Sequence, residues 1–152
     1  MQQLVENEVF RAYATYATIV LGKMMLMSLF TAYFRLTHKA FANPEDAASH
    51  SKGGDSKRFL RIDQDVERVR RCHLNDIENI VPFVGVGLLY ALSNPELSCA
   101  LLHFRIFAAS RVLHTIFYLA PVPQPSRALA FFVGFLATLS MAFCTVRSLL
   151  YI

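Results

Sequence analysis

Three polar side chains share one face of a predicted helix in the middle of the chain. Arg71, Asn75 and Glu78 lie at positions i, i+4 and i+7, which form one stripe at about 100° per residue. Their segment runs into an apolar stretch, and an ionised side chain at bilayer depth costs at least about 2.5 kcal/mol on insertion scales. Such side chains therefore face a bundle interior, a partner charge or a water-filled site.

A second stripe of this kind lies further along the chain. Arg111, His114 and Tyr118 occupy positions i, i+3 and i+7 of another apolar segment. Arginines also flank the apolar segments, because Arg35 ends the first and Arg127 begins the last. Two polar stripes beside these arginines predict a polar crevice.

The residue types in this crevice suit a small anionic zwitterion such as glutathione. Guanidinium groups bind carboxylates through charge-assisted hydrogen bonds, and Glu78 can accept from an ammonium. The alternatives are that single span-end arginines extend to lipid headgroups, and that the first stripe is a structural network between helices. We interpret Lys23 and Asp76 as such a structural pair. Hydrolase, nucleotide-binding and metal-site patterns are absent from the sequence, so no metal is expected.

Composition places these stripes in a membrane protein. Of the 152 residues, 55% are hydrophobic and 17% are charged, and a spanning helix needs roughly 20 mostly apolar residues. The predicted fold is an all-α integral membrane domain over residues 1–152, an antiparallel bundle of four transmembrane helices. The spans are expected at residues 10–35, 70–92, 97–119 and 127–150, with a solvated loop at 36–69.

Charge predicts the orientation of this domain. Nine Lys and Arg residues lie between Arg35 and Arg71, whereas the first ten residues have none. The positive-inside rule therefore places the 36–69 loop in the cytosol. The net charge of +4 suits an anionic membrane surface or ligand rather than nucleic acid. The three cysteines follow no metal or disulfide pattern and are predicted to be free thiols.

Several sequence segments carry a family resemblance that runs over almost the entire chain. They are residues 23–28 (KMMLMS), 41–46 (FANPED), 66–71 (VERVRR), 73–76 (HLND), 78–80 (ENI) and 121–129 (PVPQPSRAL). These segments resemble the microsomal glutathione S-transferases, within the family of membrane-associated proteins in eicosanoid and glutathione metabolism.

The resemblance implies a homotrimer with three glutathione sites between neighbouring subunits, near the cytosolic surface. It implies residence in the endoplasmic reticulum membrane and also in the outer mitochondrial membrane. Arg127 matches the catalytic residue nearest the sulfur. The positions that match glutathione-binding residues are Arg35, Arg70, Arg71, His73, Asn75, Glu78, Arg111, His114 and Tyr118.

The activity implied is conjugation of the glutathione thiolate to apolar electrophiles, with glutathione-dependent reduction of lipid hydroperoxides. Arg127 at a helix start would favour thiolate over thiol. The alternatives are a glutathione-dependent prostaglandin E synthase and a non-catalytic lipid-presenting protein. Ala128 and Phe131 stand where the synthase branch has serine and tyrosine, which weakens that alternative. Ala47 replaces a thiol-sensing cysteine of the transferases, so activation by thiol reagents is not expected.

Overall fold

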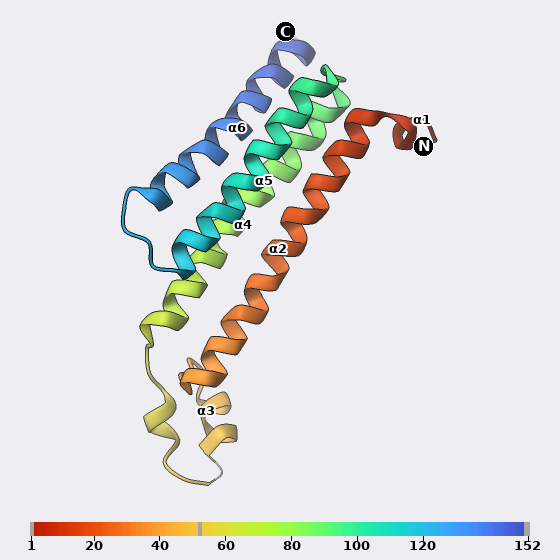
Figure 1. Cartoon of the computed structure of the whole chain (residues 1–152). Helices are drawn as coiled ribbons and strands as arrows, with labels where there is room; N and C mark the ends of the chain where they lie inside the picture. The colour runs from red at the N-terminus through yellow and green to blue at the C-terminus, as the bar shows by residue number, and fades with distance from the viewer. Residues whose placement is uncertain (1, 52, 151–152) are drawn as a thin grey trace.

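The computed structural model describes residues 2–51 and 53–150, and every regular element within them is a helix. The prediction of an all-α chain is therefore confirmed for these residues. Four long helices lie side by side along the molecule (Figure 1). They are α2 (Glu8–His38), α4 (Gln64–Leu92), α5 (Leu97–Leu119) and α6 (Ser126–Leu149).

Consecutive long helices run in opposite directions (Figure 1). Helix α2 packs against α4 and α5, and α6 packs against α5 and α4. A short helix, α1 (Gln2–Glu6), precedes α2 close to the tight turn between α4 and α5. The opposite end of the molecule carries residues 39–51 and 53–63, and we call it the loop end.

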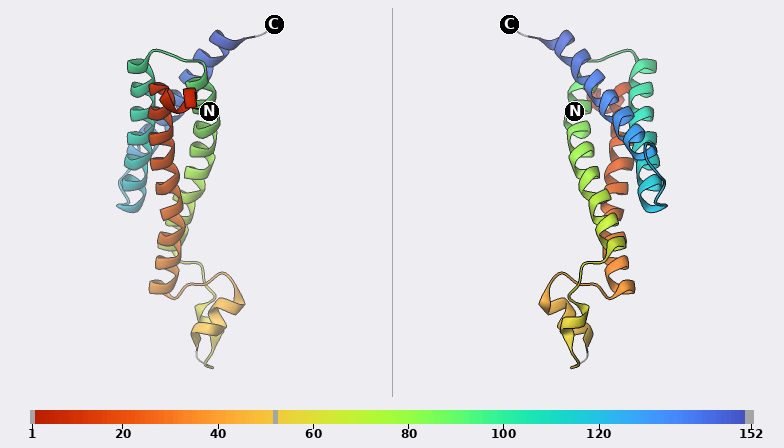
Figure 2. Two further views of the ribbon diagram at one scale, coloured as in Figure 1. Left: turned by 90° about the vertical axis from the view of Figure 1, so that its right-hand side faces the viewer. Right: turned by 90° about the vertical axis from the view of Figure 1, so that its left-hand side faces the viewer.

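The connection between α2 and α4 contains secondary structure that the sequence analysis missed. It holds α3 (Pro44–Ser51) and a 3-10 turn, η1 (Ser56–Phe59), where an irregular solvated loop was expected. Proline at the first helical position and the acidic Glu45 and Asp46 in the first turn favour helix formation. The Phe41 N–H donates to the Phe59 carbonyl over 2.9 Å. The resulting unit projects beyond α2 and α4 (Figure 2).

Side-chain caps explain where three of the four long helices begin, α2, α4 and α5. Asn7 accepts from the Phe10 N–H at the start of α2, and Glu96 accepts from two N–H groups at the start of α5. Asp63 caps α4 by accepting from the N–H groups of Asp65 and Val66. Each cap satisfies backbone donors that have no partner within the helix. Helix α4 therefore begins at Gln64, before the predicted residue 70, whereas α5 matches its predicted bounds of 97–119.

Aromatic packing holds the helices together in the half of the bundle away from the loop end. The rings of Phe83 on α4 and Phe107 on α5 stack with centroids 3.8 Å apart. The Tyr13 hydroxyl of α2 donates to the Val84 carbonyl over 2.8 Å.

Pro82 lies inside α4 and has no N–H, so the Glu78 carbonyl lacks its usual helical partner.

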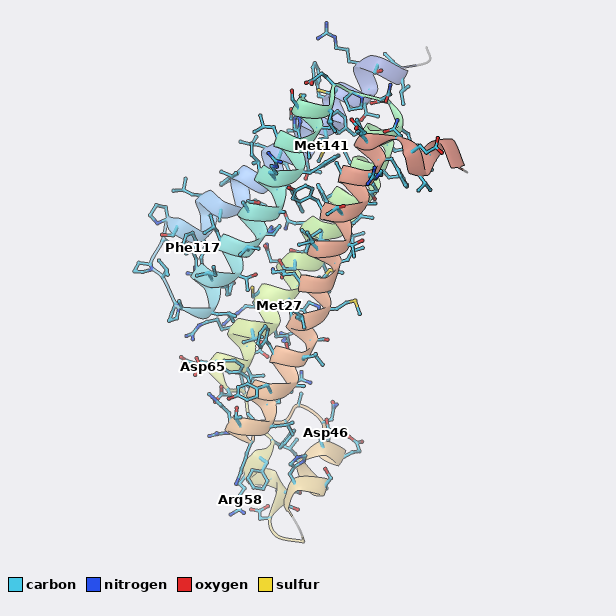
Figure 3. All side chains as sticks on the ribbon, turned by 45° about the vertical axis from the view of Figure 1, so that its right-hand side comes forward. Met27, Asp46, Arg58, Asp65, Phe117 and Met141 are labelled. Atoms are coloured by element: carbon cyan, nitrogen blue, oxygen red, sulfur yellow. The ribbon has the colours of Figure 1, made fainter. Side chains whose placement is uncertain are left out.

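Large apolar side chains cover the outside of the helices as well as the core (Figure 3). Leu29 is 64% exposed and Phe143 is 67% exposed, which suits contact with lipid chains. By length and composition, α2 and α6 qualify as membrane-crossing helices. Helices α4 and α5 carry the polar stripes and do not pass this composition test, so four spans stays a prediction.

Candidate functional site

A cavity of about 480 Å³ lies at the loop end, where α2 meets α3 and α4. Three predicted glutathione-binding residues line it together: Arg35 from α2, and Arg70 and His73 from α4. Asp46 and His50 of α3 line the same cavity and were not predicted. The cavity thus combines two arginines, two imidazoles and one carboxylate in a space suited to a small zwitterion.

The two unpredicted residues were missed because α3 was interpreted as loop. His50 is held in place because its ring lies 4.4 Å from the Phe41 ring, measured between centroids. Its Nδ1 is also 2.9 Å from the Asp46 carbonyl oxygen. The sequence signal that predicts this helix is the run Pro44, Glu45 and Asp46, which combines a helix-start proline with acidic first-turn residues.

The Arg70 side chain is held by a carboxylate of its own helix, that of Glu67. Its Nη2 donates to Glu67 Oε2 over 2.8 Å, and its Nε donates to Oε1 over 3.0 Å. This hydrogen-bonded guanidinium lowers the pKa of the Glu67 carboxyl. A bidentate pair of this kind fixes the plane of the guanidinium at the cavity rim.

Deeper in the bundle, the polar stripes of α4 and α5 meet in a buried charge network. Arg111 Nη2 donates to Asn75 Oδ1 over 3.1 Å, and Arg111 Nε lies 3.8 Å from Asp76 Oδ1. Lys23 of α2 contacts the other oxygen of Asp76, which confirms the interpretation of Lys23 and Asp76 as a structural pair. Arg111 is fully buried. Its hydrogen bond turns the Asn75 side-chain oxygen toward the interior of the bundle.

A third group lies where α5 ends and α6 begins. The Arg127 guanidinium carbon stands 4.9 Å from the centroid of the Tyr118 ring, a cation–π contact. Tyr118 has a second aromatic neighbour, because the centroid of the His114 ring lies 5.3 Å from that of the Tyr118 ring. Arg127 Nε is buried and forms no hydrogen bond with residues 2–51 and 53–150. This group places a fixed positive charge at the first turn of α6.

Two predicted residues point away from both the cavity and the buried network. Arg71 and Glu78 are exposed on α4. Glu78 lines a separate groove of about 220 Å³ between α4 and α6, which also includes Pro82 and Phe135. One chain therefore does not gather all ten predicted residues around a single cavity.

The thiols are distributed along the whole molecule and are free, as predicted. Cys72 is fully buried between α4 and α5, with its sulfur 3.8 Å from Thr115 Oγ1. Cys99 is exposed at the end opposite the loop end, and its sulfur lies 3.8 Å from His103 Nδ1. The third thiol, Cys144, is half-buried.

Comparison with known proteins places this arrangement in a family. The family model of MAPEG matches residues 13–147, which is most of the chain. The chain belongs to the MAPEG family. This membership confirms the resemblance seen in the sequence. Together with the two apolar helices, it identifies a membrane protein.

Individual MAPEG proteins are similar to the chain over its full length. It is 61% identical to microsomal glutathione S-transferase 1 of Sus scrofa and 62% identical to that of Rattus norvegicus. Each alignment covers 100% of the chain and 98% of the relative. Prostaglandin E synthase of Equus caballus is 42% identical over 91% of the chain and 88% of its own length. All ten predicted site residues, from Arg35 to Arg127, lie within the MAPEG match.

Proposed function

We propose that the protein is a glutathione S-transferase that joins the glutathione thiolate to apolar electrophiles in the membrane. The observation that carries the proposal is Arg127, which places a partly buried guanidinium over Tyr118 at the start of α6. The relatives that match over the full length are microsomal glutathione S-transferases by name, which supports the same activity.

Arg127 provides the electrostatic environment that the reaction needs. A thiol with a pKa of about 8.5 is mostly protonated at neutral pH, and the thiolate is the nucleophile. The fixed charge of Arg127 and the positive end of the α6 dipole both favour the thiolate. The thiol proton passes to water, the sulfur attacks the electrophilic carbon, and the leaving group departs with its bonding electrons.

The loop-end cavity is proposed to bind the peptide part of glutathione. Arg35, Arg70 and His73 face the cavity and suit the two carboxylates. The outward-facing Arg71 and Glu78 suit a site that a second copy of the chain completes. We therefore propose a homotrimer whose glutathione sites lie between neighbouring subunits.

Reduction of lipid hydroperoxides is the second proposed reaction of the same thiolate. The sulfur attacks the terminal oxygen and the O–O bond breaks, which releases the lipid alcohol. A second glutathione then displaces hydroxide from the sulfur. The balance is two glutathione and one hydroperoxide giving glutathione disulfide, alcohol and water.

Prostaglandin E synthesis is the second candidate, favoured by the 42% identity to the Equus caballus synthase. In that reaction glutathione is returned unchanged. The neighbours of Arg127 weigh against it, because Ala128 and Phe131 offer no hydroxyl group at the positions where that branch has one. Product analysis separates a conjugate, a reduced peroxide and an isomerised endoperoxide.

The proposed setting is the endoplasmic reticulum membrane and the outer mitochondrial membrane, crossed by all four long helices. At 1.5 Å per residue, the 31 residues of α2 reach about 46 Å, beyond the roughly 30 Å of a hydrocarbon core. The loop end would therefore project beyond the hydrocarbon core. The positive-inside rule places it on the cytosolic side. In sealed microsomes, external protease should cut residues 39–63. Cleavage confined to the turn at residues 93–96 would reverse this orientation.

The decisive experiment measures thiolate formation and product together. Purified protein in detergent is mixed with glutathione, and the ultraviolet absorbance of the thiolate is followed while mass spectrometry identifies the product of an added electrophile. We expect thiolate at neutral pH and a stoichiometric conjugate. The absence of both from correctly assembled protein would refute the proposal.

A further inference from the structure

A thiol and an imidazole lie side by side at the end of the bundle opposite the loop end. Cys99 and His103 are four residues apart on α5 and therefore share one face of the helix. The Cys99 sulfur is 3.8 Å from His103 Nδ1. In a tetrahedral zinc site, with Zn–S about 2.3 Å and Zn–N about 2.0–2.1 Å, the two ligand atoms are roughly 3.6 Å apart. The pair thus already has the spacing that chelation of one metal ion requires.

Two hydroxyl groups from neighbouring helices support this pair. His103 Nε2 lies 2.9 Å from the Ser140 hydroxyl oxygen on α6. The Tyr90 hydroxyl of α4 donates to the Cys99 sulfur over 3.6 Å. Metal-binding side chains are oriented by hydrogen bonds of this kind, and a partner for the second ring nitrogen fixes the tautomer that presents the first nitrogen to the metal. Cys99 and His103 are therefore held by contacts with two other helices.

One hydrogen bond must be exchanged when a metal binds. His103 Nδ1 lies 2.8 Å from the Cys99 carbonyl oxygen, to which it donates in the metal-free protein. On metal binding the ring proton moves to Nε2, which then donates to Ser140. The Cys99 thiol loses its proton to water and binds as a thiolate. The Cys99 carbonyl keeps the backbone N–H of His103 as its helical donor, so it is not left without a partner.

A second thiol lies across the contact between α5 and α6. These helices run antiparallel (Figure 1), and the contact between His103 and Ser140 defines their register. Cys99 is one turn before His103 on α5, and Cys144 is one turn after Ser140 on α6. This register places the two cysteines at the same level of the bundle. Cys144 is half-buried and packs against the core cluster that contains Tyr90.

The position and charge of this cluster suit a cation that enters from water. Cys99 is exposed and is the third residue of α5, so it lies at the end of the helix. The exposed Glu96 caps the same end, and a carboxylate beside the entry attracts a cation. Thiolate and imidazole ligands favour Zn²⁺, whereas Mg²⁺ and Ca²⁺ prefer oxygen ligands.

We propose that Cys99, His103 and Cys144 bind one metal ion of the zinc class, with water as the fourth ligand. The Cys144 side chain turns toward the other two ligands when the ion binds, and the ion joins α5 to α6. The site lies away from Arg127 and the loop-end cavity, so the inference is independent of the proposed transferase function. The sequence analysis expected no metal, because ligands on two separate helices form no closely spaced motif.

The test titrates Co²⁺, which occupies zinc sites and reports thiolate ligands by absorption, into untagged full-length protein with a non-thiol reductant. We expect sulfur-to-cobalt charge-transfer absorption that saturates at one ion per chain and disappears when Zn²⁺ is added. Ser140→Ala should weaken binding by about 10- to 100-fold, as loss of an outer hydrogen bond does. Cys99→Ser, His103→Gln and Cys144→Ser remove ligands and should each weaken it at least as much.

Two control variants should leave the absorption unchanged. Cys72→Ser removes a thiol that is fully buried elsewhere in the bundle. His38→Gln alters a second group of possible ligands at the loop end, His38, Asp63 and Asp65, whose ligand atoms lie within 4.8 Å of one another. An ion held there would give no sulfur-to-cobalt absorption, because that group contains no thiol.

A second readout uses only the wild type, so it does not depend on how the variants fold. Zn²⁺ should slow the alkylation of Cys99 and Cys144 by iodoacetamide, as peptide mass spectrometry measures. Equal alkylation with and without Zn²⁺, or no charge-transfer absorption in the wild type, would overturn the proposal. Unchanged Co²⁺ affinity in Cys99→Ser or Cys144→Ser, with the fold checked by circular dichroism, would overturn it as well.

Discussion

The Arg111 guanidinium donates from Nη2 to Asn75 Oδ1 over 3.1 Å and thereby links α5 to α4 inside the bundle. An amide has one accepting and one donating end. Because Arg111 holds the oxygen, the Asn75 NH₂ group is left to donate to a ligand carboxylate or carbonyl. We therefore expect Arg111 to position Asn75, whereas the sequence analysis predicted that it binds glutathione directly.

Replacing Arg111 tests this indirect role. Arg111→Lys keeps a charge near Asp76 but loses the planar fork that reaches Asn75. We expect KM for glutathione to rise about ten-fold with little change in kcat, because a hydrogen bond to a charged group is worth about 1.5–3 kcal/mol. Steady-state kinetics measure both constants. Asn75→Ala and the double variant should give the same KM if Arg111 acts through Asn75. Additive effects would contradict this.

Asp76 is expected to be essential for stability rather than for chemistry. Its side chain is fully buried between Lys23 and Arg111. Asp76→Asn leaves the two cations facing each other, and breaking a buried pair costs about 3–5 kcal/mol. Thermal unfolding in detergent should show a clear loss. Adding Lys23→Met should recover part of it, whereas a neutral Asp76→Asn variant as stable as wild type would contradict the network.

Arg127 and Tyr118 should affect the thiolate rather than glutathione affinity. Arg127→Ala should slow conjugation at saturating glutathione by about ten-fold to a hundred-fold at neutral pH, since it removes about 1.5–3 kcal/mol of charge stabilisation. Raising the pH should restore part of the rate. Tyr118→Leu removes the ring under the guanidinium and should have a smaller effect of the same kind. Tyr118→Phe, which keeps the ring, is its control. An unchanged thiolate pH midpoint in Arg127→Ala would exclude this role.

Thiol reagents should leave the enzyme without activation. Ala47 is fully buried in α3, at the place where the resemblance implies a thiol-sensing cysteine in the transferases. Cys72 is fully buried, and Cys99 is exposed at the end of the molecule opposite the loop end. N-ethylmaleimide should therefore label Cys99 with no rise in activity, as peptide mass spectrometry and a rate assay will show. Strong activation that is lost in Cys72→Ala would show that the buried thiol is a sensor.

The cap of α4 predicts a pH dependence of the loop end. The Val66 N–H, with the His38 imidazole and the Asp65 N–H, lowers the pKa of the Asp63 carboxyl. The ordinary value is about 3.9. The cap therefore stabilises the fold above that pH, and this contribution is lost as the pH falls through the lower folded pKa. Pepsin should cut residues 39–63 faster in this acidic range. Asp63→Asn, a cap without a charge, should show no such step.

The elements were predictable where local signals coincide with the ends of apolar runs. Helix α5 has the predicted bounds because Glu96 caps its start and Pro121 follows its end. Helix α3 was missed because polar composition outweighed the helix-start signal at Pro44. Asp46 and His50 were missed with it.

The polar stripes were predictable from the sequence, but the arrangement of their side chains was not. Periodicity places Arg71, Asn75 and Glu78 on one stripe, yet it cannot say which neighbour that stripe meets. In the structure Asn75 turns to Arg111, while Arg71 and Glu78 stay on the surface. Orientation depends on how three helices pack, and packing involves contacts between residues far apart in the chain. The glutathione roles of these residues stay predictions.

Pro82 creates a site in α4 where the helix can kink. Because the hydrogen bond to the Glu78 carbonyl is missing, α4 bends most easily at this turn. Beyond it, Phe83 is clamped on Phe107. Before it lie Arg70, His73 and Asn75. We therefore expect α4 to bend at this turn, with Arg70, His73 and Asn75 on one side of it and the aromatic packing on the other.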